Sequence, residues 1–288
     1  MRIIATCDLH YNIIRSRRPT ETVAREICAA GGDLLLLLGD LAGVDLSVLE
    51  RAFGLFDAFR GTKLFVPGNH ELWTEPDGDS MQRYRHALPE ICHRNGVHML
   101  DGAPFRAGDV AVVGSVGWYD YTFRLAALGV PLRFYCHKVA PGSASMRPEW
   151  RPLLDEAEDV PPAARDIVCR WMDGANVRLG CSDIEFTDFT AARLRDDLES
   201  VADARCVVVG LHHVPFHELV PRLERPTSQF AAAFLGSELL GETLQAFPNV
   251  RQVYCGHSHA FARCQRGALT ATAIGSTYVA KHRETLDL

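Results

Sequence analysis

The stretch Leu34-Leu35-Leu36-Leu37-Leu38-Gly39-Asp40 decides the fold class. Five consecutive apolar residues followed by a glycine predict a short strand that is buried on both faces, as in a parallel sheet covered by helices. In open α/β sheets, ligands bind in the crevice outside the carboxyl ends of the strands. Asp40 comes directly after the strand, so the sequence places a carboxylate where an α/β protein has its functional site.

Four other segments repeat this plan, in which an apolar run precedes side chains that can bind a metal. The apolar runs are Ile3-Ile4, Leu64-Phe65-Val66, Val207-Val208-Val209 and Val250 to Tyr254. The polar segments after them are Asp8-Leu9-His10, Gly68-Asn69-His70-Glu71, Leu211-His212-His213 and Gly256-His257-Ser258-His259. Because strand ends in such a fold meet at one edge, we expect these side chains to converge in space.

The residue types indicate a transition-metal centre. Carboxylate, imidazole and amide oxygen suit Mn, Fe, Zn or Co, and the set contains no cysteine. Residues two apart on an extended segment share a face, so the pairs Asp8/His10 and His257/His259 can each bind one ion. Asp40 is the natural bridge, because one carboxylate can link two cations about 3.5–4 Å apart that hold a hydroxide at neutral pH. A single such residue is most often a cap or a solvated loop residue; the joint pattern favours a metal centre.

The motifs Asp-x-His, Gly-Asp, Gly-Asn-His-Glu, His and Gly-His-x-His, in this order, resemble those of the calcineurin-like metallophosphoesterases. The resemblance runs from Asp8 to His259. It implies one metal ion held by Asp8, His10, Asp40 and His259, and a second held by Asp40, Asn69, His212 and His257. It also implies that His70 is not a ligand but stabilises the transition state or protonates the leaving oxygen.

The fourth motif leaves one alternative open. His212 and His213 are neighbours and would face opposite sides of a strand that continued through them, so only one can be the ligand. The family pattern is His-x-Pro or His-x-x-Pro, which favours His212 in the run that ends at Pro215. His213 would then face substrate or solvent, and His217 is interpreted as a surface residue that could also reach the pocket.

Two departures from the resemblance narrow the subclass. Serine/threonine protein phosphatases carry an Asp-x-x-Asp-Arg-Gly pattern at the second motif, whereas this chain has Asp40-Leu41-Ala42-Gly43-Val44-Asp45. Purple acid phosphatases have a tyrosine three residues after the same aspartate, where this chain has Gly43. Neither a protein phosphatase of that type nor an iron–tyrosinate centre is expected.

The composition is compatible with a globular enzyme that acts on a small molecule. The 288 residues are 47% hydrophobic and 23% charged, which is ordinary for one α/β domain spanning residues 1–288. A net charge of −6 disfavours a broad grip on nucleic acid, although Arg15, Arg17 and Arg18 follow the first motif and could meet an anionic substrate if they are not simply solvated. No apolar run approaches the ~20 residues that span a bilayer.

The chain starts with a predicted strand rather than a signal peptide, so its nine cysteines are interpreted as reduced thiols of a cytoplasmic protein. Cys92-His93 and Cys136-His137 are interpreted as ordinary core or loop residues rather than parts of a zinc site. Oligomeric state is left open.

The coarse pattern predicts alternating strands and helices. Helices are expected at Pro19–Ala30, Asp45–Arg60 with Asp45 as its cap, Ser80 towards Asn95, Thr187–Val201 and around Gln229–Phe247. Further strands are expected at Lys63–Val66, Val97–Leu100, Pro104-Phe105, Val110–Val116 and, as two short strands with a turn at Gly275, Leu269–Val279. Two mixed sheets flanked by helices, a four-layer α/β/β/α sandwich, follow from this pattern and from the resemblance.

Residues 118–182 interrupt the alternation and are predicted to form an inserted cap or lid. The segment is too long for a simple connection and is rich in aromatic residues and arginine, which disfavours disorder. We expect Trp118, Tyr119, Arg124 or Trp171 to contact the group attached to phosphate. The alternative is that most of these aromatic residues form a small core of the segment itself.

The predicted activity is metal-dependent hydrolysis of phosphoester bonds in a small molecule, either a phosphodiesterase or a phosphomonoesterase. The cofactors would be two divalent or mixed-valence ions of Mn, Fe or Zn. Asp40 and His70 would be the catalytic residues, and Asn69 and His213 would join the cap residues in binding substrate. The alternatives are a nuclease of the same fold and a non-catalytic, protein-binding scaffold.

Overall fold

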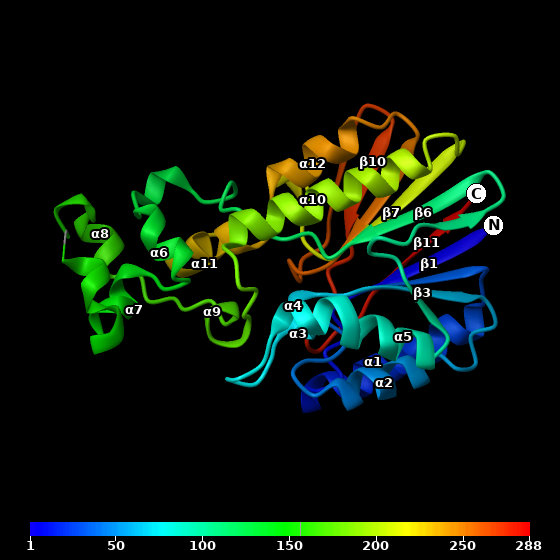
Figure 1. Ribbon diagram of the computed structural model, residues 1–288, viewed down its shortest axis with the longest axis horizontal. Coiled ribbons are helices and arrows are strands. Elements are labelled where there is room, and N and C mark those ends of the chain that lie inside the picture. Colours follow the sequence, from blue (N-terminus) through cyan, green and yellow to red (C-terminus); the bar gives the residue numbers. More distant parts are fainter. Residues whose placement is uncertain (156) are drawn as a thin grey trace.

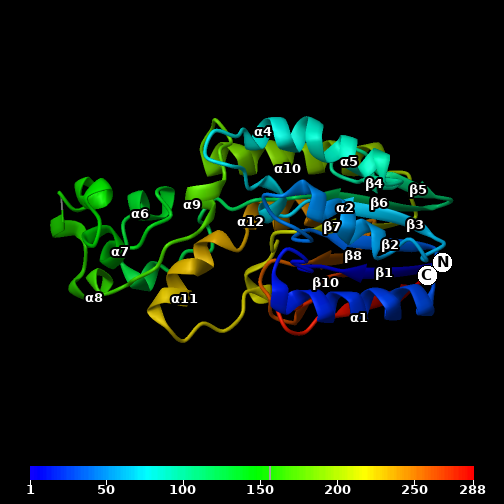
Figure 2. The ribbon, with the colours of Figure 1, turned by 90° about the horizontal axis from the view of Figure 1, so that it is seen from below.

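Two mixed β-sheets pack face to face with helices on both outer faces in the computed structural model, which describes residues 1–155 and 157–288 (Figures 1 and 2). This arrangement confirms the predicted α/β/β/α sandwich. Both ends of the chain lie at the same end of the first sheet, where the amino group of Met1 donates to the Leu288 carbonyl at 2.8 Å.

The first sheet has the strand order β11-β1-β2-β3-β4. Strands β1 to β4 run parallel to one another, and β11 adds an antiparallel edge beside β1. Their bounds are β1 Arg2–Thr6, β2 Leu34–Leu38, β3 Thr62–Val66, β4 Val97–Met99 and β11 Arg283–Asp287.

The second sheet has the order β5-β6-β7-β8-β10-β9. Four parallel strands form its centre, and β5 and β9 are antiparallel edges. The bounds are β5 Phe105–Ala107, β6 Val110–Ser115, β7 Cys206–Leu211, β8 Val250–Cys255, β9 Ala262–Arg266 and β10 Leu269–Ala273.

The run Leu34–Leu38 shows why the central strands are continuously apolar. Leu34, Leu36 and Leu38 belong to the core between the two sheets, whereas Leu35 and Leu37 belong to the core under the outer helices. All five side chains are buried. A strand with helices on one face and a second sheet on the other has no solvated side, so alternation is lost.

Helices of the first half cover the first sheet and helices of the second half cover the second (Figure 1). Below the first sheet in that view lie α1 Ile14–Ala30, α2 Leu46–Gly54, α3 Asn69–Leu72, α4 Ser80–Gln82, a π-helical turn at Arg83–Ala87, and α5 Leu88–Arg94. Over the second sheet lie α10 Asp183–Ser200 and α12 Glu238–Gln245. The chain between β7 and α12 forms a 3₁₀ turn at His217–Leu219, α11 Pro226–Ala231 and a second 3₁₀ turn at Ala232–Phe234.

Several predicted boundaries were wrong. Helix α1 begins at Ile14 and contains Pro19 within it, whereas the prediction began the helix at that proline. Asp45 does cap α2, by accepting from the Ser47 N–H at 2.9 Å, but the helix ends at Gly54 rather than Arg60. The stretch Gln229–Phe247 is two helices, because the chain is extended at Ser237, which caps α12.

The C-terminal prediction was also partly wrong. Only Leu269–Ala273 of the stretch Leu269–Val279 is a strand, and its antiparallel partner precedes it as β9. The chain after Gly275 forms a loop that returns to the first sheet as β11. Among the described residues, no helix is long and apolar enough to cross a membrane.

The segment between β6 and α10 extends beyond the carboxyl ends of the strands (Figure 1, left). Its elements are short: a 3₁₀ turn at Ala126–Leu128, α6 Leu132–Cys136, α7 Pro141–Ser145, 3₁₀ turns at Pro148–Leu154 and Ala157–Asp159, α8 Pro162–Arg165 and α9 Asp173–Asn176. Tyr135 of this segment stacks on Phe230 of α11, with ring centroids 4.6 Å apart.

Candidate metal centre

The candidate ligands all follow strands at their carboxyl ends. Asp8 comes two residues after β1, Asp40 two residues after β2, Asn69 three residues after β3 and His212 directly after β7. His257 comes two residues after β8. The two sheets therefore present these side chains towards one another at a single edge, as the strand pattern predicts.

Five of these residues have a backbone that L-amino acids rarely adopt. The φ angles are 53° at Asp8, 44° at His10, 54° at Asp40, 66° at His257 and 53° at His259. A left-handed conformation costs a non-glycine residue about 1–3 kcal/mol and is typical of functional sites. The strained turns direct side chains from sharply bending loops into one place.

The motif glycines allow close approach of the loops. A Cβ atom on Gly39 would lie 2.4 Å from Nδ1 of His212, and one on Gly68 would lie 2.2 Å from Oδ1 of Asp40. Neither separation is possible for a real side chain. These glycines are required because the ligands pack directly against the main chain.

Three lone pairs meet on one side of the site without a proton between them. His212 Nδ1 is 3.0 Å from the Leu38 carbonyl, and His257 Nε2 is 3.1 Å from the Phe234 carbonyl, so these nitrogens carry the ring protons. The free nitrogens, His212 Nε2 and His257 Nδ1, are 3.0 Å apart, and Asn69 Oδ1 is 3.1 Å from the former. Three acceptors this close repel each other, and a cation between them removes the repulsion.

The other side of the site contains buried nitrogen atoms that have no partner. Asp8, His10 and His259 each place one ligand atom within 4.8 Å of the others. His10 is fully buried, and neither of its ring nitrogens has a hydrogen-bond partner within the described residues. An unsatisfied buried polar group costs about 1–3 kcal/mol, so this donor set fits a metal ion as well.

Asp40 lies between the two groups. Its Oδ2 is 3.6 Å from His10 Nε2, and its Oδ1 is 3.4 Å from His212 Nε2. Burial raises the pKa of Asp40 well above its ordinary value, and the nearby carboxylates of Glu71 and Asp8 raise it further. A cation on either side favours the ionised carboxylate and offsets that cost.

Burial disfavours the cationic form of three histidines at the site. Burial lowers the pKa of His10 and His257 well below the ordinary value and also lowers the pKa of His212. A neutral imidazole keeps the lone pair that a metal needs.

His70 is a separate case. Burial lowers its pKa to about 4, and its ring stacks on Trp73 at 3.7 Å between centroids. Its Nε2 is 3.7 Å from Asp40 Oδ2, and the geometry groups His70 with His10 and Asp40 as possible ligands.

A cavity of about 330 Å³ opens beside the candidate ligands. Its walls include the aromatic residues Trp73, Trp171 and Tyr278, and Arg170 stands among them as the lining residue with a permanent positive charge. The other lining residues are Asp40, Asn69, His70, Met172, Asp173, His257 and His259. Residues 170–173 come from the segment expected to be a cap.

Four residues expected to bind substrate do not line this cavity. Trp118 and Tyr119 are fully buried, and their polar atoms donate to Asp183 at 2.9 Å and Asp173 at 3.0 Å. His213 is also buried, with Nδ1 at 2.8 Å from the Val116 carbonyl, and Arg124 donates to the Tyr121 carbonyl. The alternative of a small aromatic core describes Trp118 and Tyr119 better, because both side chains are fully buried, whereas Arg124 is exposed. Trp171 and Asn69 do line the cavity.

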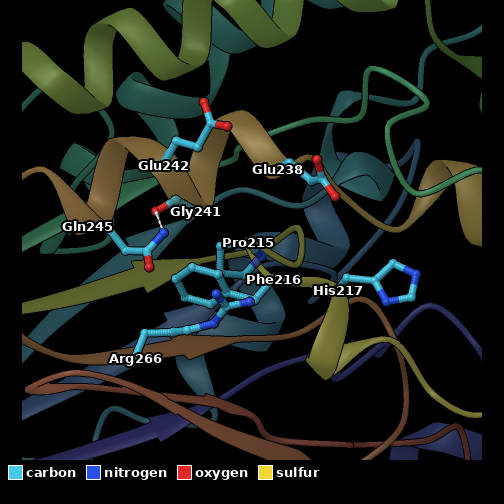
Figure 3. Close-up of a pocket in the computed structure, with 8 residues that line it drawn as sticks. All are labelled: Pro215, Phe216, His217, Glu238, Gly241, Glu242, Gln245 and Arg266. Carbon is cyan, nitrogen blue, oxygen red and sulfur yellow. Dashed lines mark hydrogen bonds between the residues drawn. The ribbon is translucent and has the colours of Figure 1, made fainter.

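The remaining candidates fall in different places. Arg15 lies 4.6 Å over the ring of Tyr278 and so stands beside the cavity, whereas Arg17 donates to the Tyr11 carbonyl. His217 lines another cavity of about 230 Å³, between Pro215-Phe216 and helix α12 (Figure 3). None of the candidate ligands lines that cavity. Among the described residues all nine cysteines are free, and neither Cys92 nor Cys136 belongs to a candidate metal group.

The motif reasoning missed two buried carboxylates. Glu71 accepts three backbone N–H groups, from Asp40, Ala42 and Gly68, at 2.7–2.8 Å, and so ties the loop after β2 to the loop after β3. Its place in the third motif was the available signal. Asp173 accepts a hydrogen bond from Asn69, which is 104 residues away in the sequence, and no local sequence pattern predicts this contact.

Comparison with known proteins gives one family. The model of the family described as calcineurin-like phosphoesterase matches residues 1–261. No curated protein sequence matches the chain.

Solved structures share the fold at low sequence identity. Phosphopantetheinyl hydrolase from Mycobacterium tuberculosis is 18% identical, with a TM-score of 0.67 over 94% of this chain and 88% of that one. The protein TT1561 of Thermus thermophilus is 14% identical, with a TM-score of 0.52 over 96% and 90% of the two chains. A dimetal phosphatase from Danio rerio is 11% identical, with a TM-score of 0.52 over 95% and 86%.

Proposed function

This chain belongs to the calcineurin-like phosphoesterases, and from that membership we propose that it is a two-metal hydrolase of phosphoester bonds in a small molecule. The observation that carries the proposal is that two groups of possible metal-binding atoms, one on either side of Asp40, lack hydrogen-bonding partners that would satisfy them. One group has three converging acceptors, and the other contains the buried, unpartnered ring of His10.

The ligand assignment follows these two groups. We assign the first ion to Asp8, His10, Asp40 and His259, and the second to Asp40, Asn69, His212 and His257. When bound, such a pair of ions supplies positive charge to the phosphoryl oxygens and lowers the pKa of water. The mixture of carboxylate, imidazole and amide oxygen suits Mn, Fe or Zn.

The protein itself would position the ester, donate a hydrogen bond to it and exclude water from around it. His70 lines the cavity and is held by its stack on Trp73, so its ring can donate to a phosphoryl or leaving oxygen. Trp73, Trp171 and Tyr278 form walls that exclude water around the ester. We also propose that residues 118–182 act as a cap, because Arg170, Trp171 and Met172 line the cavity from that segment.

The small size and aromatic walls of the cavity favour a compact ester over a polymer. A net charge of −6 supports the same choice. We further propose a cytoplasmic location, since the nine cysteines are present as free thiols.

The test is hydrolysis of p-nitrophenyl phosphate and bis(p-nitrophenyl) phosphate after chelation and after addition of Mn²⁺, Fe²⁺, Zn²⁺, Co²⁺ or Mg²⁺. We expect a metal to restore activity in the wild type and not in Asp40→Asn. His70→Ala should lower turnover by about 10²–10⁴-fold with its metal content retained. Loss of a metal ion from His70→Ala would show that His70 is a ligand. A wild type that binds two ions but cleaves neither ester would favour the scaffold alternative.

A further inference from the structure

A buried carboxylate of the inserted segment lies directly behind the candidate ligand Asn69. Asp173 is the first residue of α9 and is 1% exposed. Its Oδ1 accepts from Asn69 Nδ2 at 2.8 Å and from Trp73 Nε1 at 2.6 Å. Its Oδ2 accepts from Trp171 Nε1 at 2.8 Å and from the Tyr119 hydroxyl at 3.0 Å.

These four donors satisfy the carboxylate of Asp173 without a cation beside it. Among the described residues, Asp173 takes part in no salt bridge, although buried carboxylates usually need strong compensation. Hydrogen bonds to an ionised acceptor are roughly twice as strong as neutral ones. The carboxylate is thus held in a fixed position by two indoles, a phenol and an amide.

The bond to Asn69 has a direct consequence for the metal site. An amide group has a donor end and an acceptor end, and only the oxygen can bind a metal. The carboxylate of Asp173 is an acceptor only, so it selects the orientation in which the NH₂ group points to Asp173. Asn69 Oδ1 then faces His212 Nε2 at 3.1 Å, on the side where the second ion is assigned. The reverse orientation would point the NH₂ group at the ion.

We infer that Asp173 is a positioning residue that orients Asn69 towards the second metal ion. The inference rests on the ligand assignment of the proposed function. It makes residues 118–182 part of the metal centre as well as its cover, because Asp173 belongs to that segment. The two indoles that flank Asp173 also line the cavity, so one carboxylate fixes both the ligand and the walls.

The test measures metal binding by the full-length, metal-free chain, with Mn²⁺ or Zn²⁺ added in a calorimetric titration and no ester present. Loss of an outer-shell partner typically lowers metal affinity by about 10–100-fold. We expect Asp173→Ala to weaken one of the two equivalents to this extent and to leave the other unchanged. In an Asn69→Ala background, the same substitution should have no further effect on metal affinity.

Asp183→Ala is the matched control. Asp183 is also a buried carboxylate beside the aromatic core, and it accepts from Trp118, Tyr121 and Lys138 but not from Asn69. Its loss should lower thermal stability and leave both metal affinities unchanged. If Asp173→Ala and Asp183→Ala both weaken the binding of both metal equivalents, and to the same extent, Asp173 has only a structural role and the inference is wrong.

A second measurement does not need Asp173→Ala and so covers the case in which that variant does not fold. The side-chain amide of Asn69, assigned in ¹⁵N spectra by comparison with Asn69→Ala, should exchange its protons with solvent slowly. Fast exchange would overturn the inference. Neither of these two measurements uses an ester, so they are independent of the hydrolysis test. A wild type that binds two ions but hydrolyses no ester counts only against the proposed function. An active enzyme whose Asp173→Ala variant keeps both affinities counts only against the positioning role.

Discussion

At the scale of single residues, the candidate metal centre is built from conformations that are unfavourable on their own. Asp8, His10, Asp40, His257 and His259 have positive φ angles, and the ring of His10 is buried without a partner. Each feature costs on the order of 1–3 kcal/mol. Such costs persist only where the surrounding core enforces them, and bound cations would recover part of them.

Gly68→Ala tests how tightly the loops must approach. Gly68 has an ordinary φ of −103°, so alanine causes no backbone strain, but its Cβ would lie 2.2 Å from Asp40 Oδ1. We expect a loss of stability of about 1–3 kcal/mol from overpacking, and loss of metal binding because Asp40 must move. Calorimetric metal titration and chemical denaturation measure the two effects.

Gly54→Ala is the control for that substitution. Gly54 ends α2, and the nearest atom to a new Cβ there, apart from its chain neighbours and its own helix backbone, is Asp57 Oδ2 at 3.8 Å. Metal affinity should be unchanged there. Wild-type metal affinity in Gly68→Ala would contradict the close-approach argument.

The convergence of the candidate ligands could be predicted from sequence because each follows an apolar strand within a few residues. Asp173, the proposed partner of Asn69, could not be predicted, because it reaches Asn69 through a long-range contact from an irregular segment. The same limit explains Trp118 and Tyr119. Aromatic side chains indicate burial or binding equally well, and only their neighbours decide which.

At the scale of elements, strands were predicted better than helix ends. The run at Leu34–Leu38 has one explanation, a strand buried on both faces. The start of α1 was missed because proline is most common in the first turn of a helix, whereas Pro19 lies further inside, where packing of Val23 and Ile27 on the first sheet sustains the helix. The edge strands β9 and β11 were not predicted, because they are mostly exposed or partly buried and therefore have no apolar run.

Helix α10 provides a test of pH dependence away from the candidate metal centre. Asp197 accepts from the Gly102 N–H at 2.9 Å, and burial raises its pKa to about 6. Because the unfolded chain has a lower pKa, about 3.9, the protonated side chain favours the folded state. This stabilisation is complete below pH 4 and is lost as the pH rises through 6.

Asp197→Asn should remove that dependence, because asparagine keeps an acceptor for Gly102 and cannot ionise. We expect the variant to gain about 1–2 kcal/mol over the wild type at pH 7.5 and to gain little at pH 4. Urea denaturation at pH 4, 5, 6 and 7.5 measures the difference. A gain that is the same at every pH would mean that ionisation of Asp197 is not its cause.

At the scale of the whole molecule, the candidate ligands come from both sheets. Asp8, Asp40 and Asn69 follow strands of the first sheet, and His212 and His257 follow strands of the second. Bound ions would therefore link the two halves of the sandwich. A ligand that binds only the folded state stabilises it by about 2.7 kcal/mol at 100 times its Kd.

Metal ions should accordingly raise the melting temperature of the metal-free chain by several degrees, since a change of 1 kcal/mol shifts the midpoint by about 2–4 °C in proteins of about 150–250 residues. Differential scanning fluorimetry with increasing Mn²⁺ or Zn²⁺ measures the shift. Asp40→Asn, which lacks the shared carboxylate, should show a much smaller one. Equal shifts in both proteins would indicate non-specific binding elsewhere.

The inserted segment faces the same edge of the molecule, and its contribution to substrate binding can be separated from its contribution to the metal site. Removing the whole segment would also remove Asp173, so the loss of activity could not be assigned to either role. Arg170 is more suitable: it lines the cavity, stacks at 4.9 Å over Trp150 and is exposed. Arg147 stacks over the same indole at 5.8 Å but does not line the cavity.

Arg170→Ala should therefore lower kcat/KM, and Arg147→Ala should not. A hydrogen bond to a charged group contributes about 1.5–3 kcal/mol, so we expect a loss of about 10–100-fold for p-nitrophenyl phosphate, whose dianion offers more negative charge to Arg170 than the monoanionic diester does. The loss should be smaller for bis(p-nitrophenyl) phosphate and should appear in KM, because Arg170 is not a metal ligand. Metal content must stay at two ions in both variants. If Arg170→Ala and Arg147→Ala have the same kinetics, the segment covers the cavity without contacting the substrate through Arg170.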